Sequence, residues 1–128
     1  MGFETKGKCR KCGKVFRVRM GGGFCFHLLR CDTCGIVKSI AFDRLGSLHA
    51  RYLKGLDVPY AVVWRHADEA ARTACADAPI SQRAYHAGVE RIAGTCKCGG
   101  QHKFRARPRC PQCRSLSIRL GEIERFYD

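Results

Sequence analysis

The sequence predicts a small α+β protein in which two cysteine-rich β-hairpin segments flank a helical segment. Three observations support this fold class. The 128 residues include ten cysteines, most of them in closely spaced pairs near the two ends of the chain. After the first pair, apolar and polar residues alternate with the period of a strand, whereas the middle has the apolar spacing of helices. The length suits one compact domain, or two very small ones with an insert between them, and we divide the chain into residues 1–44, 45–93 and 94–128.

Two C-x-x-C-G units occupy residues 9–13 and 31–35. A C-x-x-C turn directs two thiolates toward one metal ion, and the glycine that follows permits a tight backbone bend. Two such turns bind one metal ion when the chain between them brings them side by side. The spacing therefore predicts a Zn²⁺ site with the ligands Cys9, Cys12, Cys31 and Cys34.

The chain between these units is expected to form a hairpin. Residues 15–20 alternate apolar and charged side chains as a strand does, and Arg17 and Arg19 share one face. Residues 21–23 are three glycines that supply a turn, and residues 24–30 return as a second strand. Such a hairpin would carry the second C-x-x-C unit back beside the first.

The last third of the chain contains a second set of four cysteines. Cys96 and Cys98 form a shorter C-x-C unit, and Cys110 and Cys113 form a C-x-x-C unit. We expect these four thiolates to bind a second Zn²⁺, with His102 as the alternative ligand if the C-x-C turn directs only one sulfur at the metal. A metal held by four thiolates has no open coordination position, so both predicted zinc sites are structural.

Disulfide bonds explain the cysteine spacing less well than metal binding does. A disulfide between cysteines three residues apart closes a short, strained loop, and the first residues lack the apolar segment of a secretory signal. A thioredoxin-like redox pair would require a βαβ setting, which the pattern does not contain. The remaining Cys25 and Cys75 are interpreted as buried free thiols.

These motifs resemble the zinc-ribbon superfamily. CRKCG at residues 9–13 and CDTCG at residues 31–35 have its spacing, and CPQC at residues 110–113 is similar to the metal-binding turns of zinc ribbons and rubredoxins. The resemblance covers about residues 7–42 and 94–123, and it implies a metal-stabilised protein with two β-hairpin zinc ribbons flanking a helical insert. Zinc ribbons commonly bind nucleic acid or serve as docking elements in transcription, translation and modification complexes. The rubredoxin-like alternative, an iron site, expects a glycine where Arg114 stands.

The middle of the chain is predicted to be mainly helical. Leucines recur at helical spacing over residues 44–56, residues 65–78 are rich in alanine, and Ser81 is placed to cap a third helix that ends near residue 92. Residues 58–64 are expected to be a short extended piece or an apolar loop. The histidines of this region have no metal-type spacing, so we assign surface or packing roles to His49, His66 and His86.

The net charge of +13 is concentrated at the two ends of the chain. Two Zn²⁺ bound by eight thiolates would lower it to about +9, which still favours a polyanionic partner. Residues 103–109 alternate cations with Phe, Ala and Pro, so an extended strand would present all four cations on one side. Phe104 and Tyr127 are candidate stacking groups. The residues predicted to contact phosphates are Lys14, Arg17, Arg19, Lys103, Arg105, Arg107 and Arg109.

The leading functional hypothesis is a cytoplasmic, non-catalytic zinc protein that binds DNA or RNA through phosphate contacts with weak sequence preference. The alternative is a zinc-stabilised adaptor that docks onto a larger protein through Tyr52, Tyr60 and Trp64. An enzyme is disfavoured because the sequence shows no paired carboxylates, phosphate loop or nucleophile constellation. The longest uncharged apolar run is too short to cross a membrane.

Overall fold

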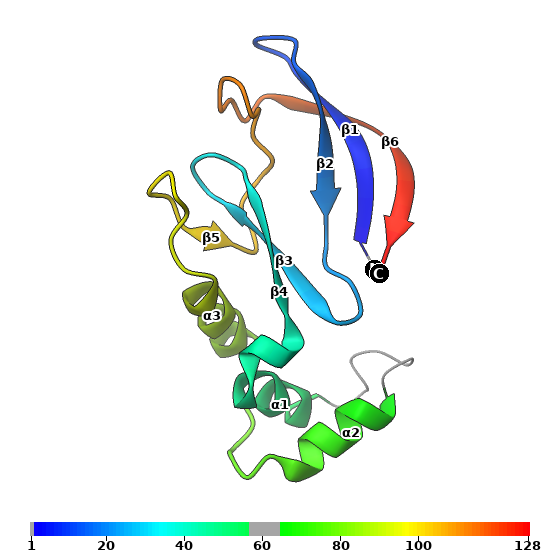
Figure 1. Cartoon of the computed structure of the whole chain (residues 1–128), viewed down its shortest axis with the longest axis vertical. Coiled ribbons are helices and arrows are strands. Elements are labelled where there is room, and N and C mark those ends of the chain that lie inside the picture. The colour runs from blue at the N-terminus through cyan, green and yellow to red at the C-terminus, as the bar shows by residue number, and fades with distance from the viewer. Residues whose placement is uncertain (1, 57–64) are drawn as a thin grey trace.

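The computed structural model describes residues 2–56 and 65–128. Over these ranges the chain forms two three-stranded antiparallel sheets and three α-helices, so the α+β class is confirmed (Figure 1). The elements are β1 (Gly2–Cys9), β2 (Val15–Met20), β3 (Phe26–Cys31), β4 (Val37–Ala41), the 3₁₀ turn η1 (Phe42–Leu45), α1 (Ser47–Lys54), α2 (Arg65–Ala74), α3 (Gln82–Ala93), β5 (His102–Lys103) and β6 (Ile118–Tyr127).

The first sheet has the order β2-β1-β6 and joins the two ends of the described chain. Its central strand β1 places Thr5 opposite Val18 of β2 and Ile123 of β6. Figure 1 shows the first and last strands side by side, with the C-terminus near the start of β1. The second sheet has the order β4-β3-β5, and its central strand β3 ends at Cys31, opposite His102 of β5.

The predicted hairpin between the first two C-x-x-C units is wrong. The strand Val15–Met20 forms as expected, but it pairs with β1, while β3 pairs with β4 in the other sheet. The C-x-x-C-G units themselves turn the chain, because Gly13 and Gly35 adopt left-handed φ values of 77° and 80°. The three glycines instead belong to the connection between the two sheets, so neither predicted ribbon is a separate sheet.

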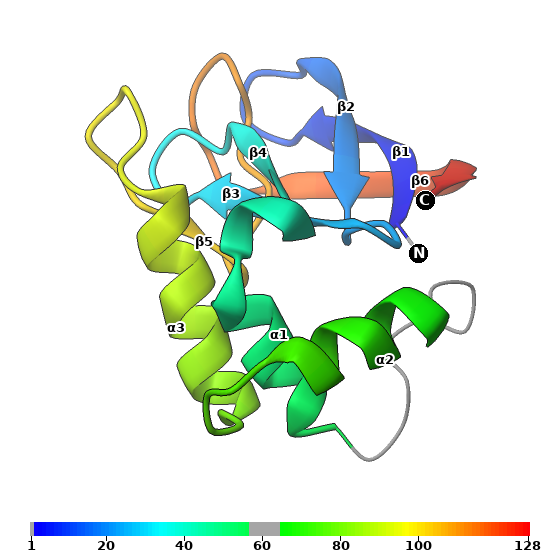
Figure 2. The same cartoon turned by 60° about the horizontal axis from the view of Figure 1, so that its bottom comes forward.

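The three α-helices lie within residues 47–93, inside the segment predicted to be helical. The α3 helix begins after Ser81, whose side-chain oxygen accepts a hydrogen bond from the backbone N–H of Ala84, as the predicted N-cap requires. In Figure 2 the helices lie together on one side of the molecule, beside the second sheet. In the described part of the chain no helix is both long and apolar enough to cross a membrane. The extended piece expected at residues 58–64 lies outside the described residues.

The hydrophobic core lies between the second sheet and helices α1 and α3. The core residues are Leu29, Ile40, Leu45, Tyr52, Tyr85, Val89 and Ala93. The rings of Tyr52 and Tyr85 stack almost parallel, with 4.1 Å between centroids. Tyr52 is therefore buried and is not the docking residue that the adaptor hypothesis expected, whereas Tyr60 and Trp64 lie outside the described residues.

A buried polar network ties the helices to the second sheet. The hydroxyl of Tyr85 lies 2.7 Å from Nε2 of His27 and 2.7 Å from Nδ1 of His49, so this one group joins β3, α1 and α3. A hydroxyl donates one proton, so it can donate to one imidazole and accept from the N–H of the other. Burial lowers the pKa of both histidines to about 4, which keeps them neutral at pH 7.

This network predicts a loss of stability in mild acid. The pKa of each histidine rises from about 4 in the folded chain to the ordinary 6.5 on unfolding, so the unfolded chain binds protons more readily. The contribution of the two neutral histidines to the free energy of unfolding is complete above pH 6.5 and is lost as the pH falls toward 4. We expect His27→Gln to flatten the fall in the free energy of unfolding between about pH 7 and pH 5. Chemical denaturation of the metal-loaded wild type and variant tests this, and parallel pH profiles would contradict it.

Candidate metal centres and basic grooves

The cysteine pairs share one backbone design. In the C-x-x-C turn at Cys9, the N–H of Cys9 donates to the carbonyl of Lys14 at 2.9 Å, and the N–H of Gly13 donates back to the carbonyl of Cys9 at 3.0 Å. The same two bonds recur in the turns that begin at Cys31 and Cys110. These bonds hold two cysteine side chains on the same side of each turn.

The turns at Cys110 and Cys96 each differ from the first two turns in one respect. In the turn at Cys110, Arg114 takes the left-handed position that glycine takes in the first two turns, with a φ of 61°. No other non-glycine residue in the described ranges has a positive φ. In the C-x-C turn the N–H of Cys96 bonds to the carbonyl of Gly100 at 2.7 Å, and Gly99 is left-handed with a φ of 92°. The C-x-C unit is thus the same turn with one residue fewer.

The eight cysteines meet in two clusters among the described residues. The outer cluster consists of Cys9, Cys12, Cys110 and Cys113, and the inner cluster consists of Cys31, Cys34, Cys96 and Cys98. The sulfur atoms of each cluster all lie within 4.8 Å of one another, and the nearest pairs are 3.4–3.6 Å apart. Such contacts are far longer than the ~2.05 Å of a disulfide and near the ~3.8 Å edge of a ZnS₄ tetrahedron.

The predicted partition of the cysteines is therefore wrong, although all eight predicted ligands take part. We expected Cys9, Cys12, Cys31 and Cys34 to share one metal, and Cys96, Cys98, Cys110 and Cys113 to share the other. The strand register explains the exchange. Cys9 lies opposite Ile118 at the start of β6, which brings the turn at Cys110 beside it. Cys31 lies opposite His102 of β5, which brings the turn at Cys96 beside it.

Both donor sets fit a metal ion that prefers sulfur ligands. Each cluster offers four thiols in a closed arrangement, which suits a structural ion rather than one with an open position for substrate. In the inner cluster, the Sγ of Cys31 accepts backbone N–H groups from Thr33 and Cys34, both at 3.4 Å. His102 takes no part in either cluster, because its Nδ1 lies 3.1 Å from the carbonyl of Gly94.

The thiols of each cluster differ in acidity. The backbone N–H of Cys12 contributes most to lowering the pKa of Cys9 to about 6. Burial opposes ionisation of Cys31, but backbone N–H groups, that of Cys34 first, outweigh it and lower the pKa to about 6. For Cys12 and Cys34 a backbone N–H acts to lower the pKa, yet neighbouring thiols and burial raise it to about 12. A divalent cation would stabilise all the thiolates together.

Arg109 connects the two clusters. Its Nε donates to the carbonyl of Asp32 at 2.9 Å, and its Nη1 donates to the carbonyl of Arg114 at 3.0 Å. Asp32 lies in a turn of the inner cluster, and Arg114 lies in a turn of the outer cluster. A Cβ on Gly35 would lie only 2.9 Å from the Cβ of Arg109, so this glycine makes room for the bridge. The guanidinium predicted to contact phosphate thus also has a structural role.

The other predicted phosphate contacts are not on one strand face. The strand expected over residues 103–109 ends at Lys103, because the chain turns at Phe104 and Arg105. Lys103 forms an ion pair with Glu90 at 3.3 Å. Arg105 and Arg107, together with Lys14, are exposed. The free thiol of Cys25 is also exposed, contrary to expectation.

An arginine groove of about 360 Å³ collects cations from both sheets. Its described basic lining residues are Arg17, Arg19, Arg30 and Arg109, and its described acidic lining residue is Glu4. The sequence alone did not single out Arg30, which follows two leucines in β3. Its guanidinium donates to the carbonyl of Arg19 across the gap between the sheets. The groove thus unites predicted residues from the two ends of the chain.

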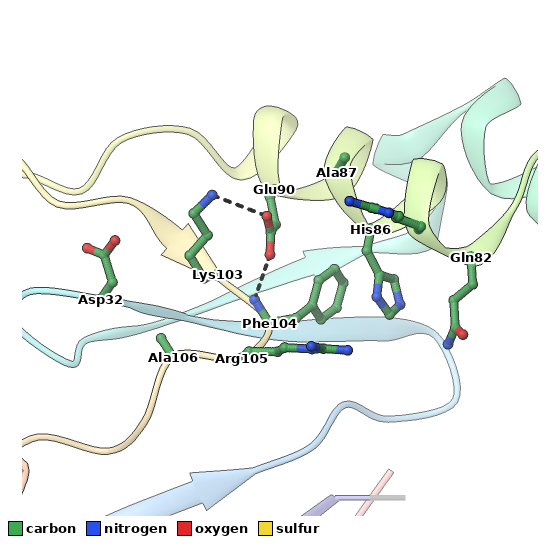
Figure 3. A pocket seen from close by; sticks show the side chains of 10 residues that line it. Asp32, Gln82, His86, Ala87, Glu90, Lys103, Phe104, Arg105 and Ala106 are labelled. Carbon is green, nitrogen blue, oxygen red and sulfur yellow. Dashed lines mark hydrogen bonds and ion pairs between the residues drawn. The ribbon is translucent and has the colours of Figure 1, made fainter.

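A second, larger groove of about 900 Å³ lies between α3 and residues 103–106 (Figure 3). It contains the stacked rings of His86 and Phe104, whose centroids are 4.3 Å apart. We call it the stacking groove. Phe104 was a candidate stacking group from the sequence, whereas His86 had only a surface or packing role. Tyr127, the other candidate, packs beneath the guanidinium of Arg19, 4.6 Å from its ring centroid.

The partition of the cysteines can be tested with paired substitutions. Cys9→Ser with Cys110→Ser removes two ligands from the outer cluster, so we expect one metal ion per chain to remain. Cys9→Ser with Cys31→Ser removes one ligand from each cluster, so we expect both metal ions to bind more weakly. Native mass spectrometry under a weak competing chelator measures the number bound. Retention of one tightly bound ion by the second variant, but not by the first, would favour the partition expected from the sequence.

Comparison with protein-family models gave one match, to a family described as a domain of unknown function (DUF8255), over residues 5–119. Comparisons with curated proteins and with solved structures found no significant match. The matched range includes all eight clustered cysteines, the whole stacking groove and every lining residue of the arginine groove except Glu4. The chain therefore belongs to this family of unknown function.

Proposed function

We propose that the protein is a non-catalytic zinc protein that binds nucleic acid through phosphate contacts, with one Zn²⁺ in each cysteine cluster. The observation that carries this proposal is the arginine groove, where guanidinium groups from both sheets line one hollow. Guanidinium binds phosphate well, because two parallel N–H donors match two of its oxygens. The net charge, +13 from the sequence and about +9 with two Zn²⁺ held by eight thiolates, would draw such a polyanion toward the chain.

The charges in the arginine groove are unevenly balanced. The Glu4 carboxylate accepts from Arg17 at 3.2 Å and from Arg125 at 2.9 Å, and these ion pairs, that with Arg125 first, lower its pKa. Arg19 and Arg30 line the same groove with no second acid among its described lining residues. Because their guanidinium groups already contact protein, they would lose less conformational entropy on binding a phosphate.

Zinc is the ion we assign to both clusters. Four thiolates at tetrahedral spacing are typical of structural zinc, and the backbone N–H groups that point at the sulfurs of Cys31 and Cys110 would stabilise bound thiolates. Each ion would contribute folding energy rather than chemistry, because its binding is coupled to bringing two turns together that are distant in the chain. We keep the cytoplasm as the expected location, where thiols stay reduced.

The test of phosphate binding is a salt series with matched arginine variants. Removing Arg17 and Arg19 takes away two counterion-releasing contacts, so we expect weaker binding and a slope of log K against log salt that is smaller by about 1.4–1.8. Arg65→Ala with Arg91→Ala removes the same charge from exposed sites on α2 and α3 and serves as the control. Fluorescence anisotropy with labelled single-stranded and duplex DNA and RNA measures both quantities. Equal slopes for the two double variants, or no binding at near-physiological salt, would refute the proposal.

One observation favours the adaptor as a second candidate. The edge strand β6 exposes Leu120, Ile123 and Phe126, which are 44%, 47% and 62% accessible. Bulges between Thr5 and its neighbours in β1 shift the register, so residues spaced by three along β6 still align on one face of the sheet. An apolar row on a sheet edge is suited to contact with another protein.

The adaptor alternative predicts a different loss from substitution. Phe126→Ser should abolish retention of a partner by the tagged protein, whereas the Arg17 and Arg19 changes should leave that retention intact. Affinity purification with quantitative mass spectrometry compares the variants, and metal content verifies that Phe126→Ser keeps both clusters. The same partners retained by Phe126→Ser and by the wild type would rule out this surface.

A further inference from the structure

We propose that the stacking groove binds the base of an unpaired nucleotide, so that the preferred ligand is a single-stranded nucleic acid or an unpaired segment of one. This inference rests on the proposed function and specifies the ligand class. The groove is hollowed between α3 and residues 103–106, and its volume is within the range of sites that hold a small molecule or one nucleotide.

The aromatic pair in this groove is fixed in place. Figure 3 shows the rings of His86 and Phe104 facing each other, with the Arg105 side chain extending beside them. The buried ring of His27 packs nearly perpendicular to Phe104, with 5.2 Å between centroids. The backbone N–H of Phe104 donates to Oε1 of Glu90 at 3.1 Å. A base could therefore stack here without first ordering the rings, which favours binding.

The charges around the pair suit a phosphate beside the base. Glu90 accepts from the ammonium of Lys103 at 3.3 Å, so these two charges largely cancel. Asp32 accepts from the N–H of Gln101, at the far end of the groove in Figure 3. Arg83 and Arg105 are exposed cations on the groove wall. Burial, with the positive charge of Arg105, lowers the pKa of His86 against the opposing effect of Glu90, so its ring is neutral and stacks as an aromatic.

The two grooves adjoin through a smaller hollow. Arg19 and Arg30 line both the arginine groove and this hollow. Phe104 and Ala106 line both the hollow and the stacking groove. A strand with its phosphates along the arginines would therefore pass close to the aromatic pair. A base that stacks on protein must leave its own stack, which an unpaired nucleotide does at little cost and a duplex does not.

The decisive experiment separates bases from phosphates. Labelled oligothymidine about 12 nucleotides long is compared with an abasic deoxyribose-phosphate strand of the same length. We expect the zinc-loaded wild type to bind oligothymidine at least about fivefold more tightly than the abasic strand. His86→Ala should bind the two strands equally while its affinity for the abasic strand stays unchanged. His86→Phe should restore the preference, and His66→Ala, an exposed position on α2, is the control.

The outcomes separate this inference from the proposed function. Equal binding of both strands by the wild type, or a preference that survives in His86→Ala, would overturn the stacking site but leave phosphate binding in place. No binding of either strand would overturn the proposed function as well. Thymidine monophosphate as competitor distinguishes the source of the nucleotide. If thymidine monophosphate displaces labelled oligothymidine only at a far higher concentration than unlabelled oligothymidine does, the ligand is a strand. If both competitors act at the same concentration, the inference of a strand is overturned in favour of a free nucleotide. Metal content confirms that each variant is folded.

Discussion

The crossing of the two cysteine clusters is the constraint on which the rest of the structure depends. Each cluster combines the two cysteines of one turn in the first 34 residues with the two cysteines of one turn in the last third. The two ends of the chain must therefore meet twice. The strand pairs β1–β6 and β3–β5 satisfy this requirement, and the bridge from Arg109 fixes the clusters relative to each other. The helices then cover the second sheet, where the buried hydroxyl of Tyr85 joins them to β3.

Local features of this fold could be predicted from the sequence, whereas long-range pairing could not. The C-x-x-C and C-x-C spacings identify all eight clustered cysteines, and the Ser81 cap and helical spacing place the helices, because these signals act over a few residues. Which turn meets which depends on β5 and β6, and β5 has only two residues. The four cysteine turns have similar designs, and nothing in the sequence shows which two share a metal ion. The expected pairing therefore joins each turn to the nearest one along the chain. Arg30 and His86 were missed because their roles come from neighbours distant in the chain.

The arginines show how one residue type can hold the backbone together and still line a groove. Arg109 donates to two backbone carbonyls and Arg30 to one, and both still line the arginine groove. Guanidinium groups have five donors, so contacts within the protein leave others for a ligand. This sharing makes charge-removing substitutions of Arg30 and Arg109 ambiguous, whereas Arg17 and Arg19 report on the groove with less disturbance to the metal sites.

The nesting of the clusters sets the order in which they can be completed during synthesis. Cys31 and Cys98 are 67 residues apart, whereas Cys12 and Cys110 are 98 residues apart, and the inner pair lies entirely within the outer one. At about 5–20 residues per second, a ribosome needs roughly 5–20 s to extend the chain from Cys12 to Cys110. Throughout that interval the thiols of the first turn have no opposing turn of their own. The inner cluster is therefore complete first. Until the turn with Cys110 and Cys113 emerges, Cys9 and Cys12 must stay reduced and must not share a metal ion with cysteines of the inner cluster.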